Sequence, residues 1–196
     1  MQNKGEVVVS LTGKGSQTFL VPKMLNGVLG SRFKPIMGYK GSRGSTHAME
    51  LGEVHGASLT WLTLKKNRSW WFDNSDHPTK ALPIIQVGFR SEPGLQHVPL
   101  ASKLAKTKAD RQIVNFIASF GPIGRDLTQP PGVSKSLATT LRKFFDSLVK
   151  DKTFIAAATK RKLKIEPKSG AEVQAIVAEL LKISPEVVAR AQDHSR

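Results

Sequence analysis

The sequence predicts an α/β protein with a mainly parallel sheet, followed by a helical C-terminal segment. In the first half, short apolar runs alternate with helical patterns, and this alternation is typical of parallel strands joined by helices. The strands are near-continuous apolar runs, which favours a sheet covered on both faces. From about Thr107 onward, the apolar residues keep the 3–4 spacing of helices instead.

Four strands and two helices are expected in the first half. We place the strands at residues 7–11, 33–39, 57–64 and 82–89, because each is a short apolar run with turn-forming residues beside it. The helices are expected from Phe19 to Leu29 and from Ser45 to Glu53. Glycine-rich loops at residues 12–18 and 38–45 follow the first two strands. Ligands of such sheets bind beyond the carboxyl ends of the strands, so these loops are the expected binding region.

Capping pairs mark the helices of the second half. Thr107 with Asp110 and Ser169 with Glu172 have the spacing in which a hydroxyl and a carboxylate satisfy first-turn amides. One helix between them carries an apolar stripe of Leu137, Leu141, Phe144, Phe145 and Leu148. Such a stripe is typical of a helix face that packs against a core.

Composition excludes several classes of protein. The 196 residues contain no cysteine, which excludes a disulfide framework, a thiolate zinc site and a cysteine nucleophile. The apolar runs are far shorter than a membrane span. The first residues contain no visible signal peptide, so the chain as written is expected in the cytoplasm.

A strong positive charge raises the alternative of nucleic-acid binding. Thirty Lys and Arg against fifteen Asp and Glu give a formal net charge of +15, which attracts polyanions. The excess is spread along the chain, with a dense cluster at residues 160–164 and a looser one at Lys103, Lys106, Lys108 and Arg111. No nucleic-acid-binding motif accompanies these clusters. We therefore favour a solvated basic surface and keep nonspecific binding of nucleic acid or another polyanion as the alternative.

The loop at residues 12–18 has the composition of an anion-binding turn. Gly13 and Gly15 let the backbone approach a ligand, Ser16 and Thr18 add hydroxyl groups, and the next helix presents free N–H groups. The loop matches neither a dinucleotide-binding fingerprint nor a P-loop. A plain strand–helix turn capped by Ser16 explains the same pattern equally well.

The loop at residues 38–45 repeats this arrangement with Tyr39, Gly41 and Ser42. Two such loops on neighbouring parallel strands would bind one anionic group together, since a carboxylate accepts several hydrogen bonds. Lys40 and Arg43 are expected to be solvated.

No motif indicates catalysis, a metal or a cofactor. The five histidines lack metal-binding spacing, and no serine sits in a nucleophile elbow; the histidines are His47, His55, His77, His97 and His194. His47 and Glu50 are expected to form a surface pair on one helix. We therefore expect a binding protein and not an enzyme.

A succession of segments along nearly the whole chain resembles one known family. The segments are residues 9–18, 21–34, 38–42, 48–56, 98–100, 104–107, 110–112, 130–133, 169–174 and 185–191. Together they resemble the substrate-binding proteins of tripartite tricarboxylate transporters, the Bug-type receptors. The resemblance implies a periplasmic-binding-protein-like fold of two α/β lobes that closes on a small carboxylate and delivers it to a membrane permease. It also implies that loop amides and hydroxyls hold the carboxylate, with Gly13, Gly15 and Ser16 as the first positions.

The same resemblance implies a truncated receptor. Family members begin with a signal peptide and the first half of lobe one, and this sequence starts after them. Residues 1–119 would form the second lobe, and residues 120–196 a helical segment that packs on the missing first lobe. Without that lobe, the apolar stripe favours self-association or instability. Binding of di- or tricarboxylates by a single lobe should then be weak or lost.

Overall fold

The chain divides into a sheet unit and a helical unit. The structure, a computed structural model, describes residues 5–73, 76, 80–124, 126–161, 163 and 165–195. The sheet unit comprises Met1–Phe120 and Ile183–Arg196, and the helical unit comprises Gly121–Lys182. The chain therefore leaves the sheet unit after Phe120 and returns to it at Ile183.

A three-stranded parallel sheet lies at the centre of the sheet unit. Its strands are β1 (Val7–Ser10), β2 (Phe33–Ile36) and β3 (Gly56–Ala57), in the order β2-β1-β3. Ser10 pairs with Ile36 on one side of β1 and with Ala57 on the other. The predicted α/β class with a parallel sheet is confirmed, because each strand is reached from the previous one through a crossover helix.

Two of the expected strands differ from the structure. The run at residues 57–64 contributes only to β3, because Thr60 caps helix α3 (Trp61–Asn67) by accepting a hydrogen bond from an amide of its first turn. Residues 82–89 form no strand in the part of the chain that the structure describes, where Gln86 makes an isolated β-bridge. The apolar composition of these two segments predicted strands. In the structure, the Thr60 cap starts a helix in the first segment, and loop contacts shape the second.

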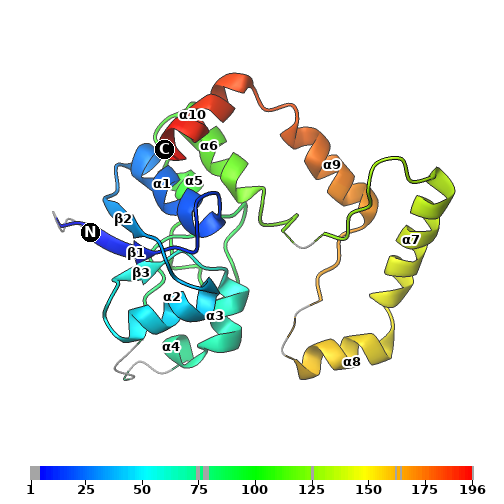
Figure 1. The fold of residues 1–196 in the computed structure, drawn as a ribbon, viewed down its shortest axis with the longest axis horizontal. Helices are drawn as coiled ribbons and strands as arrows, with labels where there is room; N and C mark the ends of the chain where they lie inside the picture. The colour runs from blue at the N-terminus through cyan, green and yellow to red at the C-terminus, as the bar shows by residue number, and fades with distance from the viewer. Residues whose placement is uncertain are drawn as a thin grey trace. The chain divides into compact units, whose positions relative to one another are not determined.

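Helices cover both faces of the sheet (Figure 1). The remaining helices of the sheet unit are α1 (Gln17–Leu29), α2 (Gly41–Glu50), α4 (Trp70–Asp73), α5 (Ala101–Leu104), α6 (Lys108–Ala118) and α10 (Pro185–Ser195). Figure 1 shows α1, α5, α6 and α10 on one side of the sheet and α2, α3 and α4 on the other. Helix α2 begins at Gly41, earlier than the expected Ser45, so part of the second glycine-rich loop belongs to its first turn.

The main core of the sheet unit lies among α1, α6 and α10. Val187 and Ala191 stand one turn apart on α10 and are buried in this core, while Arg190 pairs with Asp110 of α6 over 3.1 Å. The core residues are Met24, Leu25, Ala101, Ala105, Ile113, Val114, Ile117, Val187 and Ala191. Helix α10 therefore belongs with the sheet unit, whereas the sequence grouped it with residues 120–196. The few apolar residues of α10 do not by themselves specify which helices they contact.

The helical unit contains α7 (Lys135–Leu148), α8 (Lys152–Lys160) and α9 (Gly170–Leu180). The predicted capping box at the start of α9 is confirmed: Ser169 Oγ accepts from the Glu172 amide, and the Glu172 carboxylate accepts from the Ser169 amide. These bonds lower the pKa of Glu172.

Little apolar surface is fully buried within the helical unit. Ala158 is the one buried apolar residue among its described residues. Three members of the apolar stripe on α7 remain exposed, namely Leu137 at 48%, Leu141 at 43% and Phe144 at 63%. The helices of this unit are therefore held mainly by their own capping and backbone hydrogen bonds.

Candidate anion-binding site

The two glycine-rich loops start from neighbouring strands. In the parallel pair of β1 and β2, Ser10 lies opposite Ile36, and the Leu11 amide donates to the Ile36 carbonyl over 3.0 Å. Both loops therefore leave the same edge of the sheet. Helix α1 then lies on one side of the sheet and α2 on the other (Figure 1). In a parallel sheet with this strand order the topological switch point, where open α/β sheets bind ligands, lies between β1 and β3, so the loop at residues 12–18 borders it.

The hydroxyl groups of the first loop are engaged with one another. Ser16 Oγ donates to the Gly13 carbonyl over 2.7 Å and lies 2.7 Å from Thr18 Oγ1, which accepts from the Thr12 amide over 3.1 Å. Ser16 is the N-cap residue of α1, but its side chain makes no capping bond. These hydrogen bonds hold the shape of the loop.

Main-chain amides are the free donors at the first loop. Gln17 and Thr18 are the first two residues of α1, and their amides donate to no other described residue. Gly15, with φ of 83°, adopts the left-handed backbone that lets the chain turn into the helix. The helix dipole adds partial positive charge at this point.

The second loop runs directly into α2. Gly38 and Gly41 have φ of 116° and 65°, values that favour glycine. Ser42 and Arg43 follow in the first turn, and their amides also donate to no other described residue. Tyr39 is half-buried against the start of the helix, since a Cβ at Gly44 would lie 3.8 Å from the Tyr39 Cβ. The second loop thus presents the same type of donor as the first.

Positive charge at both helix starts is not balanced by nearby carboxylates. Neither α1 nor α2 has an acidic residue in its first turn. Lys14, Lys40 and Arg43 are exposed, and their side chains form no ion pair with the described residues. Cations near a helix N-terminus are unfavourable because they oppose the helix dipole. A bound anion would therefore stabilise this edge of the sheet.

Two buried hydroxyl groups, one on β1 and one on α2, have no hydrogen-bond partner among the described residues. Ser10 Oγ and Ser45 Oγ belong to residues with 0% exposure, and neither makes a hydrogen bond. Phe33 packs against the core on the α1 side, and its neighbour Val7 shares that face, so Ser10 points to the α2 side. Ser10 is the last residue of β1, and Ser45 is the fifth residue of α2.

A third loop, which the sequence analysis missed, leaves the same edge of the sheet. Residues 58–60 follow β3, and Thr60 then caps α3. The signal was the pair of hydroxyl residues Thr60 and Thr63, whose spacing suits a helix start. The loop at residues 58–60 was not expected at the site because the sequence predicted a strand over residues 57–64.

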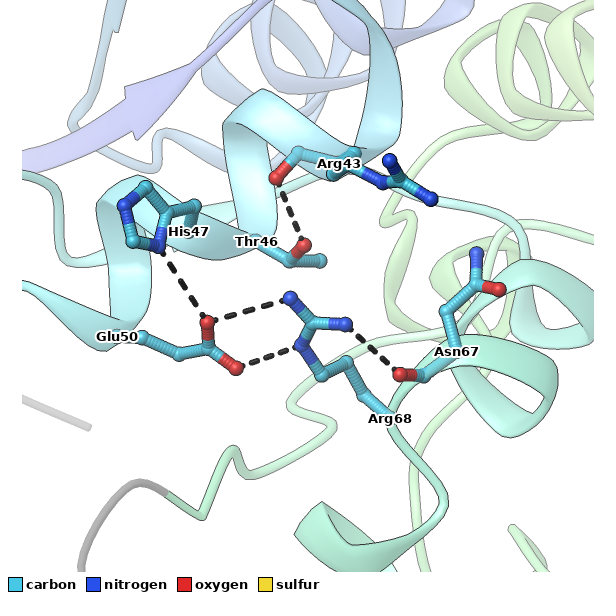
Figure 2. Close-up of polar contacts among 6 residues, drawn as sticks. All are labelled: Arg43, Thr46, His47, Glu50, Asn67 and Arg68. Atoms are coloured by element: carbon cyan, nitrogen blue, oxygen red, sulfur yellow. Dashed lines mark hydrogen bonds and ion pairs between the residues drawn. The ribbon is translucent and has the colours of Figure 1, made fainter.

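The far end of α2 carries an ion-pair network (Figure 2). Arg68 donates to both Glu50 oxygens, over 2.6 Å from Nε and 3.2 Å from Nη2, and to the Asn67 carbonyl over 2.8 Å. His47 Nδ1 lies 3.8 Å from Glu50 and its side chain is 65% exposed, so the expected surface pair is confirmed. The described residues contain no group of three side chains that would hold a metal ion. The network therefore ties α2 to the end of α3.

Other candidates from the sequence lie away from this edge or outside the described residues. Lys103, Lys106, Lys108 and Arg111 are exposed along α5 and α6 and the turn between them. Lys162, Lys164 and His77 lie outside the described residues, as does the side chain of His194.

No protein-family model, curated protein or solved structure matches this chain. Within the described part of the chain, no helix is long and apolar enough to cross a membrane.

Proposed function

We propose that the sheet unit binds a small organic di- or tricarboxylate where the loops at residues 12–18 and 38–45 leave the sheet. The observation that carries this proposal is the set of free amides at two adjacent helix starts, beside cations without counter-ions. Each hydrogen bond to a carboxylate contributes about 1.5–3 kcal/mol. The donors are main-chain groups and cations, which suits binding and gives no group for covalent or acid–base chemistry.

This activity suits a receptor that captures a carboxylate and passes it to a membrane permease, as the family resemblance implies. In that role the protein works in the periplasm and needs neither metal nor cofactor. Association itself costs several kcal/mol, so a single open site with a few such bonds is expected to bind with a Kd of about 1 mM.

The substitution Gln17→Glu tests the proposed site without endangering the fold. A carboxylate at the first residue of α1 interacts favourably with the helix dipole, so stability should be kept or raised. The same carboxylate repels an anionic ligand and should raise the Kd for citrate about tenfold or more. Binding is followed by the amide NMR shifts of Gln17, Thr18, Ser42 and Arg43.

Gln112→Glu is the matched control, because it makes the same change of charge at an exposed position of α6. It should leave the Kd for citrate as in the unaltered protein. Absence of any amide shift with citrate, tricarballylate or glutarate would refute carboxylate binding. Equal Kd values for the two Gln→Glu variants would place the ligand elsewhere.

The exposed cations on α5 and α6 favour one second candidate, nonspecific polyanion binding. This function predicts a gel shift of any duplex at low salt that falls steeply as salt is added. Lys103→Gln with Lys106→Gln should weaken that shift. No shift at low salt eliminates the candidate.

A further inference from the structure

We infer that His55 is a pH-sensitive contact between β1 and β3, which holds the start of β3 against β1 while its imidazole is neutral and releases it when the imidazole gains a proton. This inference is independent of the proposed carboxylate binding.

His55 bonds to one residue of β1 with both its main chain and its side chain. Its amide donates to the Val8 carbonyl over 2.9 Å, and its Nδ1 accepts from the Val8 amide over 3.0 Å. In a parallel pair of strands, the acceptor for such an amide is normally a main-chain carbonyl of the neighbouring strand. The imidazole nitrogen takes the place of that carbonyl, directly before β3 begins at Gly56.

This role requires one protonation state of the imidazole. A neutral imidazole has one nitrogen that donates and one that accepts, so Nδ1 accepts when the proton is on Nε2. A charged imidazole has a proton on both nitrogens, and its Nδ1 then presents a donor to the Val8 amide, which is itself a donor. Histidine side chains gain this proton between about pH 8 and pH 5, so mild acid should break the bond.

No ion pair among the described residues offsets the charge that His55 gains in acid. The charged and titratable side chains beside it, on the start of β1, on β2, at the end of α2, after α2 and after α3, are Glu6, Lys34, His47, Glu50, Glu53 and Arg68. Lys34 pairs with Glu6, and Arg68 pairs with Glu50. The side chain of His55 is exposed, so water can supply the proton directly.

The bond has a large share in this pairing because β3 is short. Gly56 and Ala57 alone form the strand, opposite Val9 and Ser10. Loss of the adjacent bond at Val8 should therefore loosen β3 and the loop at residues 58–60 that follows it. The main core lies among α1, α6 and α10, so the protein should stay folded in mild acid.

Hydrogen exchange of the whole protein at about pH 7.5 and about pH 5 tests this inference. The protection factor of the Val8 amide should fall about tenfold in acid, the factor that one hydrogen bond supplies. The protection factor of the Val114 amide, in the buried middle of α6, should stay unchanged and serves as the internal reference. Long-range proton–nitrogen NMR correlations should show that neutral His55 carries its proton on Nε2.

Two variants at this position isolate the imidazole. His55→Asn places an amide oxygen near the position of Nδ1, and this acceptor does not titrate, so the protection of Val8 should be the same at both pH values. His55→Leu removes the acceptor and should give low protection at both. The matched control is His97→Asn, at an exposed histidine elsewhere in the sheet unit, which should keep the fall in acid.

Protection of the Val8 amide that does not change with pH in the unaltered protein overturns the inference. An equal fall in His55→Asn also overturns it, because the fall would then come from another group. A proton on Nδ1 of neutral His55 has the same consequence, since that nitrogen could not accept.

Discussion

Gln86 shows how one buried side chain organises a long loop. Its Nε2 donates to the carbonyls of Leu95 and Val98 over 2.9 and 2.7 Å, and its Oε1 accepts from the Glu92 amide over 2.9 Å. The residue is 8% exposed, so these bonds are shielded from water. In the sequence Gln86 is an isolated polar residue in an apolar run, and its partners are main-chain groups that only the folded loop brings near.

Gln86→Leu should destabilise the sheet unit strongly. The substitution keeps the approximate volume of the side chain but leaves the buried Val98 carbonyl and the Glu92 amide without their partner, at a cost of about 3 kcal/mol, whereas the Leu95 carbonyl keeps its bond from the Val98 amide. Urea unfolding measures the loss as a lower midpoint. Gln112→Leu, at an exposed position of α6, should leave the midpoint nearly unchanged. Equal midpoints for the two variants would mean that Gln86 does not hold the loop.

The contact between α6 and α10 depends on the ionisation of Asp110. The Thr107 hydroxyl lowers the pKa of this carboxyl group below its ordinary 3.8, burial raises it in part, and the charge of Arg190 lowers it further. A group whose pKa is depressed by folding contributes stability above its unfolded pKa. That contribution is lost as the pH falls through the lower pKa of the folded state.

Asp110→Asn should therefore lower the free energy of unfolding at pH 7 by about 0.5–1 kcal/mol, the range of an exposed ion pair with a helix-dipole contribution. The difference between variant and unaltered protein should shrink as the pH falls below about 3.9. Urea titrations at several pH values measure this difference in the free energy of unfolding. Glu53→Gln, at an exposed position after α2, serves as the control. A difference that stays constant with pH would contradict the assignment to Asp110 ionisation.

At the scale of elements, the sequence predicted the start of a helix correctly where the capping residues are close together in the chain. Ser169 with Glu172 and Thr107 with Asp110 mark the starts of α9 and α6, because the groups that bond are three residues apart. The strand predicted over residues 57–64 is wrong beyond Ala57. Apolar composition fits a strand as well as a helix, and the Thr60 cap favours the helix.

For the candidate site, the neighbouring positions of the two loops followed from the alternation of strands and helices. The alternation fixes parallel strands, and parallel strands bring their carboxyl ends to one edge. The sequence did not predict that Ser16 bonds to the Gly13 carbonyl, nor that the hydroxyls of Ser10 and Ser45 are buried without a partner. These depend on rotamers and on which face of β1 meets α2, and neither is encoded in the spacing of residues.

At the scale of the whole molecule, the sheet unit builds its core without the helical unit. Every buried residue of the main core lies outside residues 121–182, and both Phe120 and Ile183 pack against that core. Replacement of residues 121–182 by a short Gly/Ser linker should therefore leave a folded sheet unit with cooperative thermal unfolding.

The isolated helical unit serves as the comparison. Residues 121–182 alone should unfold with little cooperativity, because Ala158 is the one fully buried apolar residue among those described there. Circular dichroism during heating measures both fragments. Loss of cooperative unfolding in the linked sheet unit would show that its stability depends on residues 121–182.

The return of the chain at Ile183 has a consequence for biosynthesis. Val187 and Ala191 complete the core between α1 and α6, yet they are synthesised only after residues 121–182. While the ribosome translates residues 121–182, the emerging polypeptide exposes the apolar surface that α10 will later cover. Nascent chains of this protein should therefore bind chaperones until α10 has emerged from the ribosome and can cover this surface.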